Sequence, residues 1–181
     1  MIRLILAATL GASYGIYGPA FEHCENRPLK PGSEEYLDSE KYQLRHWDLG
    51  NPNSLQGLIA RVNQIRKENP ALQSDWSLRF HGSDSDQLIV YSKTSADLSN
   101  VIVTVVNLDP YHTQSGWVDL SLEALGLDPQ QPYQMHDLLS EARYLWHGPH
   151  NYVQLDPTTM PAHIFRVRRR VRTERDFDYF L

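Results

Sequence analysis

The chain reads LIVYS at residues 88–92 and VIVTVVN at residues 101–107. Both runs are short and rich in β-branched residues, which suit the pleated surface of a sheet. Four further candidate strands have the same character. They lie at residues 116–120, 133–137, 152–155 and 163–171. Turns are expected at residues 82–84 (Gly-Ser-Asp) and 109–110 (Asp-Pro). Short strands at such intervals predict an antiparallel β-sandwich, with one helical turn at residues 121–126.

The clearest helix pattern lies before these strands, at residues 54–68. Asn53 or Ser54 can cap the helix, and Asn69-Pro70 ends it. Its apolar residues share one face. They are Leu55, Leu58, Ile59, Val62 and Ile65. A helix with one apolar face needs another surface to cover it.

The first residues predict a different kind of structure. Residues 2–10 are apolar and resemble the end of a buried helix that stops at Gly11, and residues 13–18 read as a short buried strand. A helix followed by a strand is typical of an α/β unit. We therefore expect two domains, at residues 1–71 and 72–181. The apolar run 4–10 is too short to span a bilayer, and a signal peptide is the less favoured interpretation.

Residues 19–50 form a long polar segment that also carries aromatic residues. Loops of this length in compact domains are usually functional or disordered, and the aromatic content favours an ordered functional loop. Its four acids, Glu34, Glu35, Asp38 and Glu40, lack a rigid scaffold and are best interpreted as solvated. The neighbouring Lys41-Tyr42 pair suits a phosphate or sugar-phosphate oxygen, although such pairs are also common on surfaces.

Several function classes are disfavoured by composition. The formal net charge of −5 argues against nucleic acid as a partner, and the arginines at 166–172 are expected to be solvated at a strand edge. Cys24 is the only cysteine, so an internal disulfide is impossible and a reducing compartment is favoured. His147 and His150 flank Gly-Pro, which indicates a turn rather than a metal site. We expect no metal and no cofactor.

Three motifs carry a family resemblance. They are YGIYGPAFE at residues 14–22, GSEEYLDSEKY at residues 32–42 and RHWD at residues 45–48. Together they closely resemble the bacterial alpha-1,4-glucan:maltose-1-phosphate maltosyltransferases of the alpha-amylase superfamily, glycoside hydrolase family 13. The resemblance covers essentially the whole chain and continues through the ending at residues 170–180. It implies a C-terminal fragment of a cytoplasmic transferase of glycogen biosynthesis whose partners are maltose 1-phosphate and alpha-1,4-glucan.

The family architecture implies the origin of each part. The fold class expected is an α+β fragment: the last strand and helix of a (β/α)8 barrel, followed by an antiparallel β-sandwich. Residues 1–10 would end the seventh helix, 13–18 form the eighth strand, and 54–68 form the eighth helix. Active sites of such barrels are built from loops after the strands, which places residues 19–50 on the catalytic face. By resemblance, Lys41 and Tyr42 bind maltose 1-phosphate, and the parent enzyme is a homodimer.

The family's nucleophilic aspartate, acid/base glutamate and second aspartate lie on earlier barrel strands. None is matched in this chain, so we expect no catalytic residue here and no activity of the chain alone. The alternative hypothesis is a non-catalytic glucan-binding β-sandwich. It would stack sugar rings on exposed aromatic side chains, although such side chains more often belong to a core. The candidates are Trp76, Trp117, Tyr144 and Trp146.

Overall fold

The computed structural model describes residues 1–37 and 44–169 of the chain. It divides into two compact units, one made of Met1–Ser13 with Val62–Leu181 and the other of Tyr14–Arg61. Lys41, Tyr42 and the arginines beyond residue 169 lie outside the described residues. The helical elements come first in the chain. They are α1 (Ile2–Leu10), α2 (Gly18–Glu22), α3 (Gln56–Glu68) and the 3-10 helix η1 (Pro70–Gln73).

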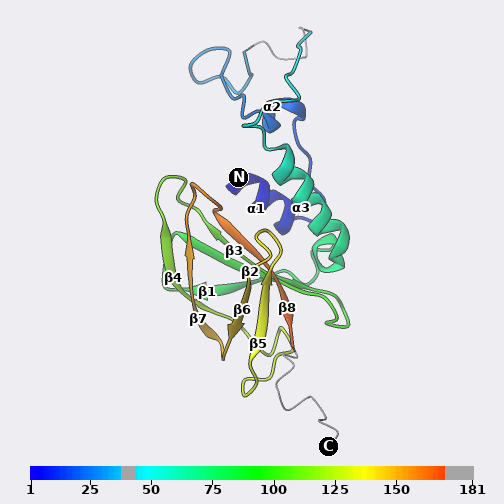
Figure 1. Cartoon of the computed structure of the whole chain (residues 1–181), viewed down its shortest axis with the longest axis vertical. Coiled ribbons are helices and arrows are strands. Elements are labelled where there is room, and N and C mark those ends of the chain that lie inside the picture. The colour runs from blue at the N-terminus through cyan, green and yellow to red at the C-terminus, as the bar shows by residue number, and fades with distance from the viewer. Residues whose placement is uncertain (38–43, 170–181) are drawn as a thin grey trace, which may run out of the picture. The chain divides into compact units, whose positions relative to one another are not determined.

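Eight antiparallel strands follow and form the body of the larger unit (Figure 1). They are β1 (Arg79–Ser83), β2 (Leu88–Thr94), β3 (Val101–Asn107), β4 (Gln114–Asp119), β5 (Tyr133–Asp137), β6 (Arg143–Trp146), β7 (His150–Leu155) and β8 (Ala162–Arg168). The strand order is β6-β5-β8-β3-β2-β1-β4-β7. The sequence-based prediction of an antiparallel β domain is therefore confirmed.

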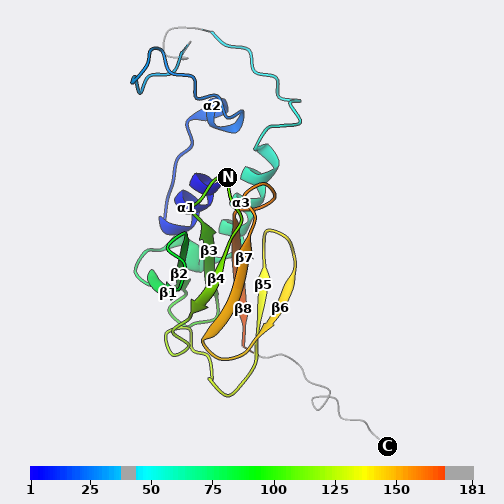
Figure 2. The ribbon, with the colours of Figure 1, turned by 90° about the vertical axis from the view of Figure 1, so that its left-hand side faces the viewer.

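Strand β1 joins the two halves of this sheet. Its residues Arg79 to His81 pair with β2, whereas Gly82 and Ser83 pair with β4. A strand that changes partners halfway along must bend, and the bend turns the sheet back over itself. Gly82 lies at this point, facing Asp119 across the pair. The folded-back sheet is seen from a second side in Figure 2.

The space enclosed by the sheet holds the main hydrophobic core. Seven of the eight strands contribute to it, together with the leucines of the segment between β4 and β5. The members are Leu88, Val90, Val101, Val103, Val105, Val118, Leu120, Leu122, Leu125, Leu127, Tyr133, Met135, Trp146, Val153, Leu155, Phe165 and Val167. Residues of β3 alternate between this core and the opposite face of the sheet.

The opposite face of β3 is buried as well, so every residue of this strand is buried. Helix α1 packs there with Leu4, Ile5 and Ala8, all almost fully excluded from solvent. Figures 1 and 2 both place α1 beside this part of the sheet. The helix thus finds in β3 the covering surface that its apolar residues require.

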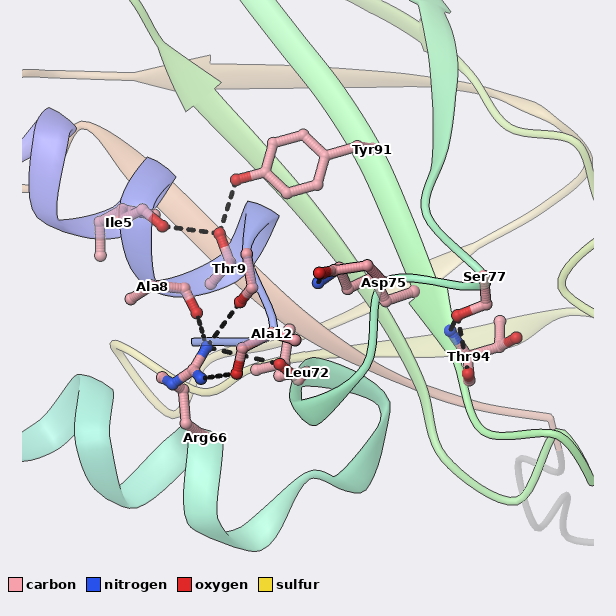
Figure 3. A network of polar contacts seen from close by, with 12 residues as sticks. Ile5, Ala8, Thr9, Ala12, Arg66, Leu72, Asp75, Ser77, Tyr91 and Thr94 are labelled. Atoms are coloured by element: carbon pink, nitrogen blue, oxygen red, sulfur yellow. Dashed lines mark hydrogen bonds and ion pairs between the residues drawn. The ribbon is translucent and has the colours of Figure 1, made fainter. Parts of the chain in front are cut away.

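Polar contacts fix α1 and η1 against the sheet (Figure 3). The hydroxyl of Thr9 lies 2.6 Å from the Tyr91 hydroxyl on β2, and burial raises the pKa of Tyr91 to about 12. Next along β2, the ammonium of Lys93, with 1% of its side chain exposed, binds the Asp75 carboxylate at 2.8 Å. This bond holds the pKa of Asp75 below its ordinary value.

Arg66 of α3 binds the end of α1. Its guanidinium donates to the carbonyl oxygens of Ala8, Gly11 (3.1 Å) and Ala12 (2.6 Å) (Figure 3). The last carbonyls of a helix lack partners within the helix and carry partial negative charge, so a cation there is favourable. Gly11 is extended rather than left-handed, and a Cβ on it would lie 2.9 Å from the Ser13 carbonyl oxygen. Close approach explains this glycine.

A second residue, Asn69, also bonds α3 to the sheet. It directly follows α3 and is completely buried. Its side-chain oxygen accepts from Asn100 at 2.9 Å and from two nitrogens of Arg166 at 3.0 and 2.8 Å. Its amide nitrogen donates to the Ile65 carbonyl at 2.7 Å. One side chain therefore joins the end of α3, the turn before β3, and β8.

Most sequence-based predictions of elements hold. Helices were predicted at 2–10 and 54–68, and the structure has them as Ile2–Leu10 and Gln56–Glu68. The Ser54 hydroxyl accepts from the first turn of α3, at Gln56, as predicted for one of the two candidate caps. All six predicted strands are present, two of them with the predicted bounds, 101–107 and 133–137. The one helical turn predicted at 121–126 is present, since the Leu125 N–H donates to the Ser121 carbonyl at 3.3 Å.

Other predictions were wrong. Gly82 and Ser83 belong to β1 rather than a turn, and β6 had no strand prediction at all. Strand β8 lies between β3 and β5, not at an edge, and its Arg166 binds Asn69 instead of being solvated.

Residues 13–18 do not form the predicted barrel strand. The backbone N–H of Gly18 donates to the Ile16 carbonyl at 2.9 Å, with Tyr17 at φ −76° and ψ 78°, which is a tight three-residue turn. The eight strands of the sheet do not include this segment, and its last residue, Gly18, begins α2.

The Asn69 contacts predict a large loss of stability in Asn69→Ala. The change leaves Arg166 and Asn100 without their buried acceptor, which should lower the free energy of unfolding by about 2–3 kcal/mol. Urea denaturation followed by circular dichroism measures this. Gln64→Ala, at an exposed position on α3, should change stability by less than about 0.5 kcal/mol. Equal stability of the two variants would contradict the role given to Asn69.

Candidate functional site

The unit of residues 14–61 contains the segment predicted to bind substrate. Before that segment the chain doubles back on itself. Leu29 N–H donates to the Glu35 carbonyl and Leu37 N–H to the Arg27 carbonyl, both at 2.8 Å. The Tyr36 ring meets Tyr17 edge-on at a centroid distance of 5.8 Å. The chain is therefore held by backbone bonds up to residue 37.

After the segment the chain is held by side chains. The Trp47 ring stacks on His23, with centroids 5.4 Å apart and planes only 8° from parallel. The guanidinium of Arg45 lies 4.3 Å from the centre of the Trp47 ring and 3.7 Å from the Glu25 carboxylate. Arg45, Trp47 and His23 thus form a stacked group of side chains next to α2.

Helix α2 itself is bonded to the residues before α3. The Glu22 carboxylate accepts from the Ser54 hydroxyl at 3.0 Å, and the Glu22 carbonyl accepts from Leu55 N–H at 2.8 Å. Asn51 approaches His23 at 3.4 Å. These bonds hold α2 and His23, and therefore the His23–Trp47 stack, against the residues before α3.

The predicted site residues fall between the two anchored flanks. Lys41 and Tyr42 lie outside the described residues, as do Asp38 and Glu40, so their roles stay predictions. Glu34 and Glu35 are described and are exposed. Exposed carboxylates on a loop do not make the closely spaced pair that glycoside chemistry requires, in line with their interpretation as solvated.

The four aromatic candidates for sugar stacking differ in the structure. Trp146 is 7% exposed and packs on Phe165 in the core, with centroids 5.5 Å apart. Trp117 is 43% exposed, but His150 stacks on its ring at 4.8 Å. Tyr144 meets Phe165 edge-on. Trp76 is the most exposed of the four, at 65%. Burial therefore excludes Trp146 from a binding role.

A polar cluster around the buried Asp137 superficially resembles a catalytic triad. Its carboxylate accepts from Ser140 at 2.5 Å and contacts His163 at 3.0 Å. In a triad the histidine lies between the acid and the hydroxyl, but here the carboxylate lies between the other two. The arrangement cannot activate Ser140, and Asp137 instead ties β5 to β8 through the Ile164 N–H at 3.2 Å.

Of the two histidines weighed as metal ligands, His150 has a bonding partner at the start of β7. His150 binds the Asp119 carboxylate on the neighbouring strand at 2.7 Å. Between the histidines, the Gly148 carbonyl accepts from the Tyr133 hydroxyl at 2.7 Å and from Asn151 at 3.0 Å. In the described ranges, no group of three or more possible ligands gathers. Nor does any described helix have the length and apolarity to cross a membrane.

Solved structures show which class of protein has this fold. A maltogenic alpha-amylase from Thermotoga neapolitana superposes with a TM-score of 0.59, at 12% identity, over 91% of this chain and 35% of its own. An Anoxybacillus alpha-amylase gives a TM-score of 0.52 at 16% identity, over 71% of this chain and 25% of its own. The β-rich fold is therefore one found in alpha-amylases.

Sequence relatives narrow the class to one family. The family model described as "GLGE, C-terminal" matches residues 80–167. The alpha-1,4-glucan:maltose-1-phosphate maltosyltransferases of Methylacidiphilum infernorum and Chlorobaculum tepidum are 48% and 49% identical, each over 92% of this chain. The chain spans about a quarter of their length, 25% and 26%. It belongs to the maltosyltransferase family and corresponds to its C-terminal part.

The Asp137 cluster predicts a specific acid sensitivity. Burial opposes ionisation, but bonds from His163, Ser140 and Leu139 N–H hold the pKa of Asp137 below its ordinary value. Its contribution to stability is therefore fully present above the unfolded pKa, about 3.9, and is lost as the pH falls through the folded pKa. Asp137→Asn should reduce stability by about 1–3 kcal/mol at pH 7.

The same variant should lose stability less steeply than the parent chain as the pH is lowered below about 4. Urea midpoints measured at several acidic pH values test this. Asp128→Asn, at an exposed turn, serves as the matched control and should keep the parent's slope. Parallel curves for Asp137→Asn and the parent would refute the assignment.

Proposed function

We propose that this chain forms the C-terminal part of an enzyme that transfers maltosyl units from alpha-maltose 1-phosphate to the non-reducing end of alpha-1,4-glucans. The observation that carries this proposal is the 48–49% identity to maltosyltransferases over 92% of the chain. Glycogen biosynthesis in the cytoplasm and a homodimeric parent belong to the same proposal, on the strength of the family resemblance alone.

The proposed reaction is a double displacement. An enzyme carboxylate attacks C1 of the maltosyl group, so the bond from C1 to the phosphate oxygen breaks and phosphate leaves, taking a proton from a second carboxyl group. The 4-hydroxyl of the glucan end then attacks C1, loses its proton to the second carboxyl group and releases the first. Both carboxylates belong to other barrel strands of the parent, and this chain supplies donor binding instead.

Lys41 and Tyr42 are the proposed donor contacts. The ammonium donates charge-assisted hydrogen bonds to the phosphate, and the phenol adds a neutral one. Support comes from the motif at 32–42 and from the anchored flanks of this segment. Bonds to Leu29 and Leu37 hold one side, and the Trp47 stack holds the other.

The proposal assigns the helical elements to a (β/α)8 barrel of the parent enzyme. In this proposal residues 1–71 complete the barrel, with 13–18 as its eighth strand and α3 as its eighth helix, and residues 72–181 form the C-terminal domain. In such a barrel, residues 13–18 would pair with the strands on either side. The segment at 19–50 then follows a strand end, where such barrels place their active sites.

Lys41→Ala tests the donor contact in the full-length parent enzyme. Loss of a charge-assisted bond should raise the KM for maltose 1-phosphate by about ten- to one-hundred-fold. Steady-state phosphate release measures it, with glucan saturating. Lys30→Ala, an exposed lysine at the turn before the segment, should leave the KM within about two-fold. An unchanged KM in Lys41→Ala would remove the assignment.

A further inference from the structure

The larger unit has a hollow whose described lining residues all lie between Trp76 and Ala124. Its volume is about 300 Å³, at the lower end of the usual range for small-ligand pockets. Its lining combines apolar side chains with hydroxyls and one guanidinium. The lining residues are Trp76, Ser77, Arg79, Ser92, Thr94, Ala96, Leu98 and Ala124.

Trp76 supplies an aromatic surface to this hollow. With 65% of the residue exposed, a large apolar ring faces water. Trp117, by comparison, has one face of its ring covered by His150 at 4.8 Å. The apolar C–H face of a sugar ring packs well on an open aromatic ring, while the sugar's edge stays polar.

The buried Ser92 supplies a directed hydroxyl. His81 Nδ1 accepts from the Ser121 backbone N–H at 3.2 Å, so in the neutral ring the proton is on Nε2. Burial and the nearby Arg79 lower the pKa of His81 to about 4, which keeps that ring neutral at physiological pH. Nε2–H therefore donates to the Ser92 oxygen at 2.8 Å, and Ser92 keeps its own hydrogen to donate.

Two more polar groups line the same hollow. Ser77 is bonded to the backbone of Thr94, accepting from its N–H at 2.9 Å and donating to its carbonyl at 2.8 Å. Both bonds use backbone atoms of Thr94, so the Thr94 side-chain hydroxyl takes part in neither. Arg79 pairs directly with Ser92 across the strands, so its side chain lies on the same face.

We propose that this hollow binds an alpha-glucan chain, with Trp76 stacking on a glucose ring and Ser92, Thr94 and Arg79 bonding its hydroxyls. An aromatic ring beside several hydroxyls and one cation matches a neutral, hydroxyl-rich ligand with an apolar ring face. The site binds glucan and does no chemistry. It rests on the proposed function, which supplies glucan as the ligand class.

Affinity electrophoresis of the 181-residue chain in gels that contain glycogen tests the site. The parent chain should be retarded, and Trp76→Ala should lose most of this retardation. Ser92→Ala should weaken binding by about three- to ten-fold, the usual effect of one hydrogen bond. Because Trp76 is exposed, thermal unfolding of Trp76→Ala should match the parent, which separates lost binding from lost folding.

Trp117→Ala is the matched control, since Trp117 is an exposed tryptophan outside the hollow. Retardation that persists in Trp117→Ala and disappears in Trp76→Ala supports the proposal. Unretarded parent chain, unchanged migration of Trp76→Ala, or equal loss in both variants overturns it.

The glucan site and the proposed reaction can fail separately. In the full-length enzyme, Trp76→Ala should raise the KM for glycogen at least three-fold and leave the KM for maltose 1-phosphate unchanged. If the full-length enzyme transfers no maltosyl group, the proposed function fails while glycogen retardation of the chain still decides the site. If transfer occurs and retardation does not, only the glucan site fails.

Discussion

The guanidinium of Arg66 at the end of α1 is the contact on which the arrangement of the larger unit depends. A helix of nine residues is marginal alone, and its last carbonyls need donors. Arg66 supplies them from α3, at the Ala8, Gly11 and Ala12 oxygens. With its end fixed, α1 covers β3, and the Thr9–Tyr91 bond sets its position. Arg66 thus supports the helix that buries the second face of β3.

The double burial of β3 also explains which parts of the fold could be predicted from sequence. VIVTVVN has apolar residues on both faces, so its bounds were predicted correctly. Strand β1 reads RFHGS, is partly exposed along its length and contains a glycine, so its residues resembled a turn. Strand β6 has four residues, of which three are exposed. Pairing with neighbours, rather than local preference, makes these two segments strands.

The candidate site residues, too, could be predicted from sequence only in part. Lys41 and Tyr42 were singled out by family resemblance, since the pair alone is common on surfaces. Of the tryptophans, sequence could not separate Trp146, buried in the core, from Trp76, exposed at the hollow. The His81–Ser92 bond had no signal at all, because the two residues meet only when β1 and β2 pair. Arg166 was misjudged because its acceptor, Asn69, is 97 residues away.

The face of β2 and β3 that points away from the main core limits where recombination could divide this domain. Tyr91, Lys93 and Ile102 are each about 1% exposed because residues before the sheet cover them. A recombination point between helices and sheet would uncover an apolar face, a phenol and an ammonium together, and the product would be prone to aggregate. Selection should therefore keep the helices and the sheet in one reading frame, as a single heritable block.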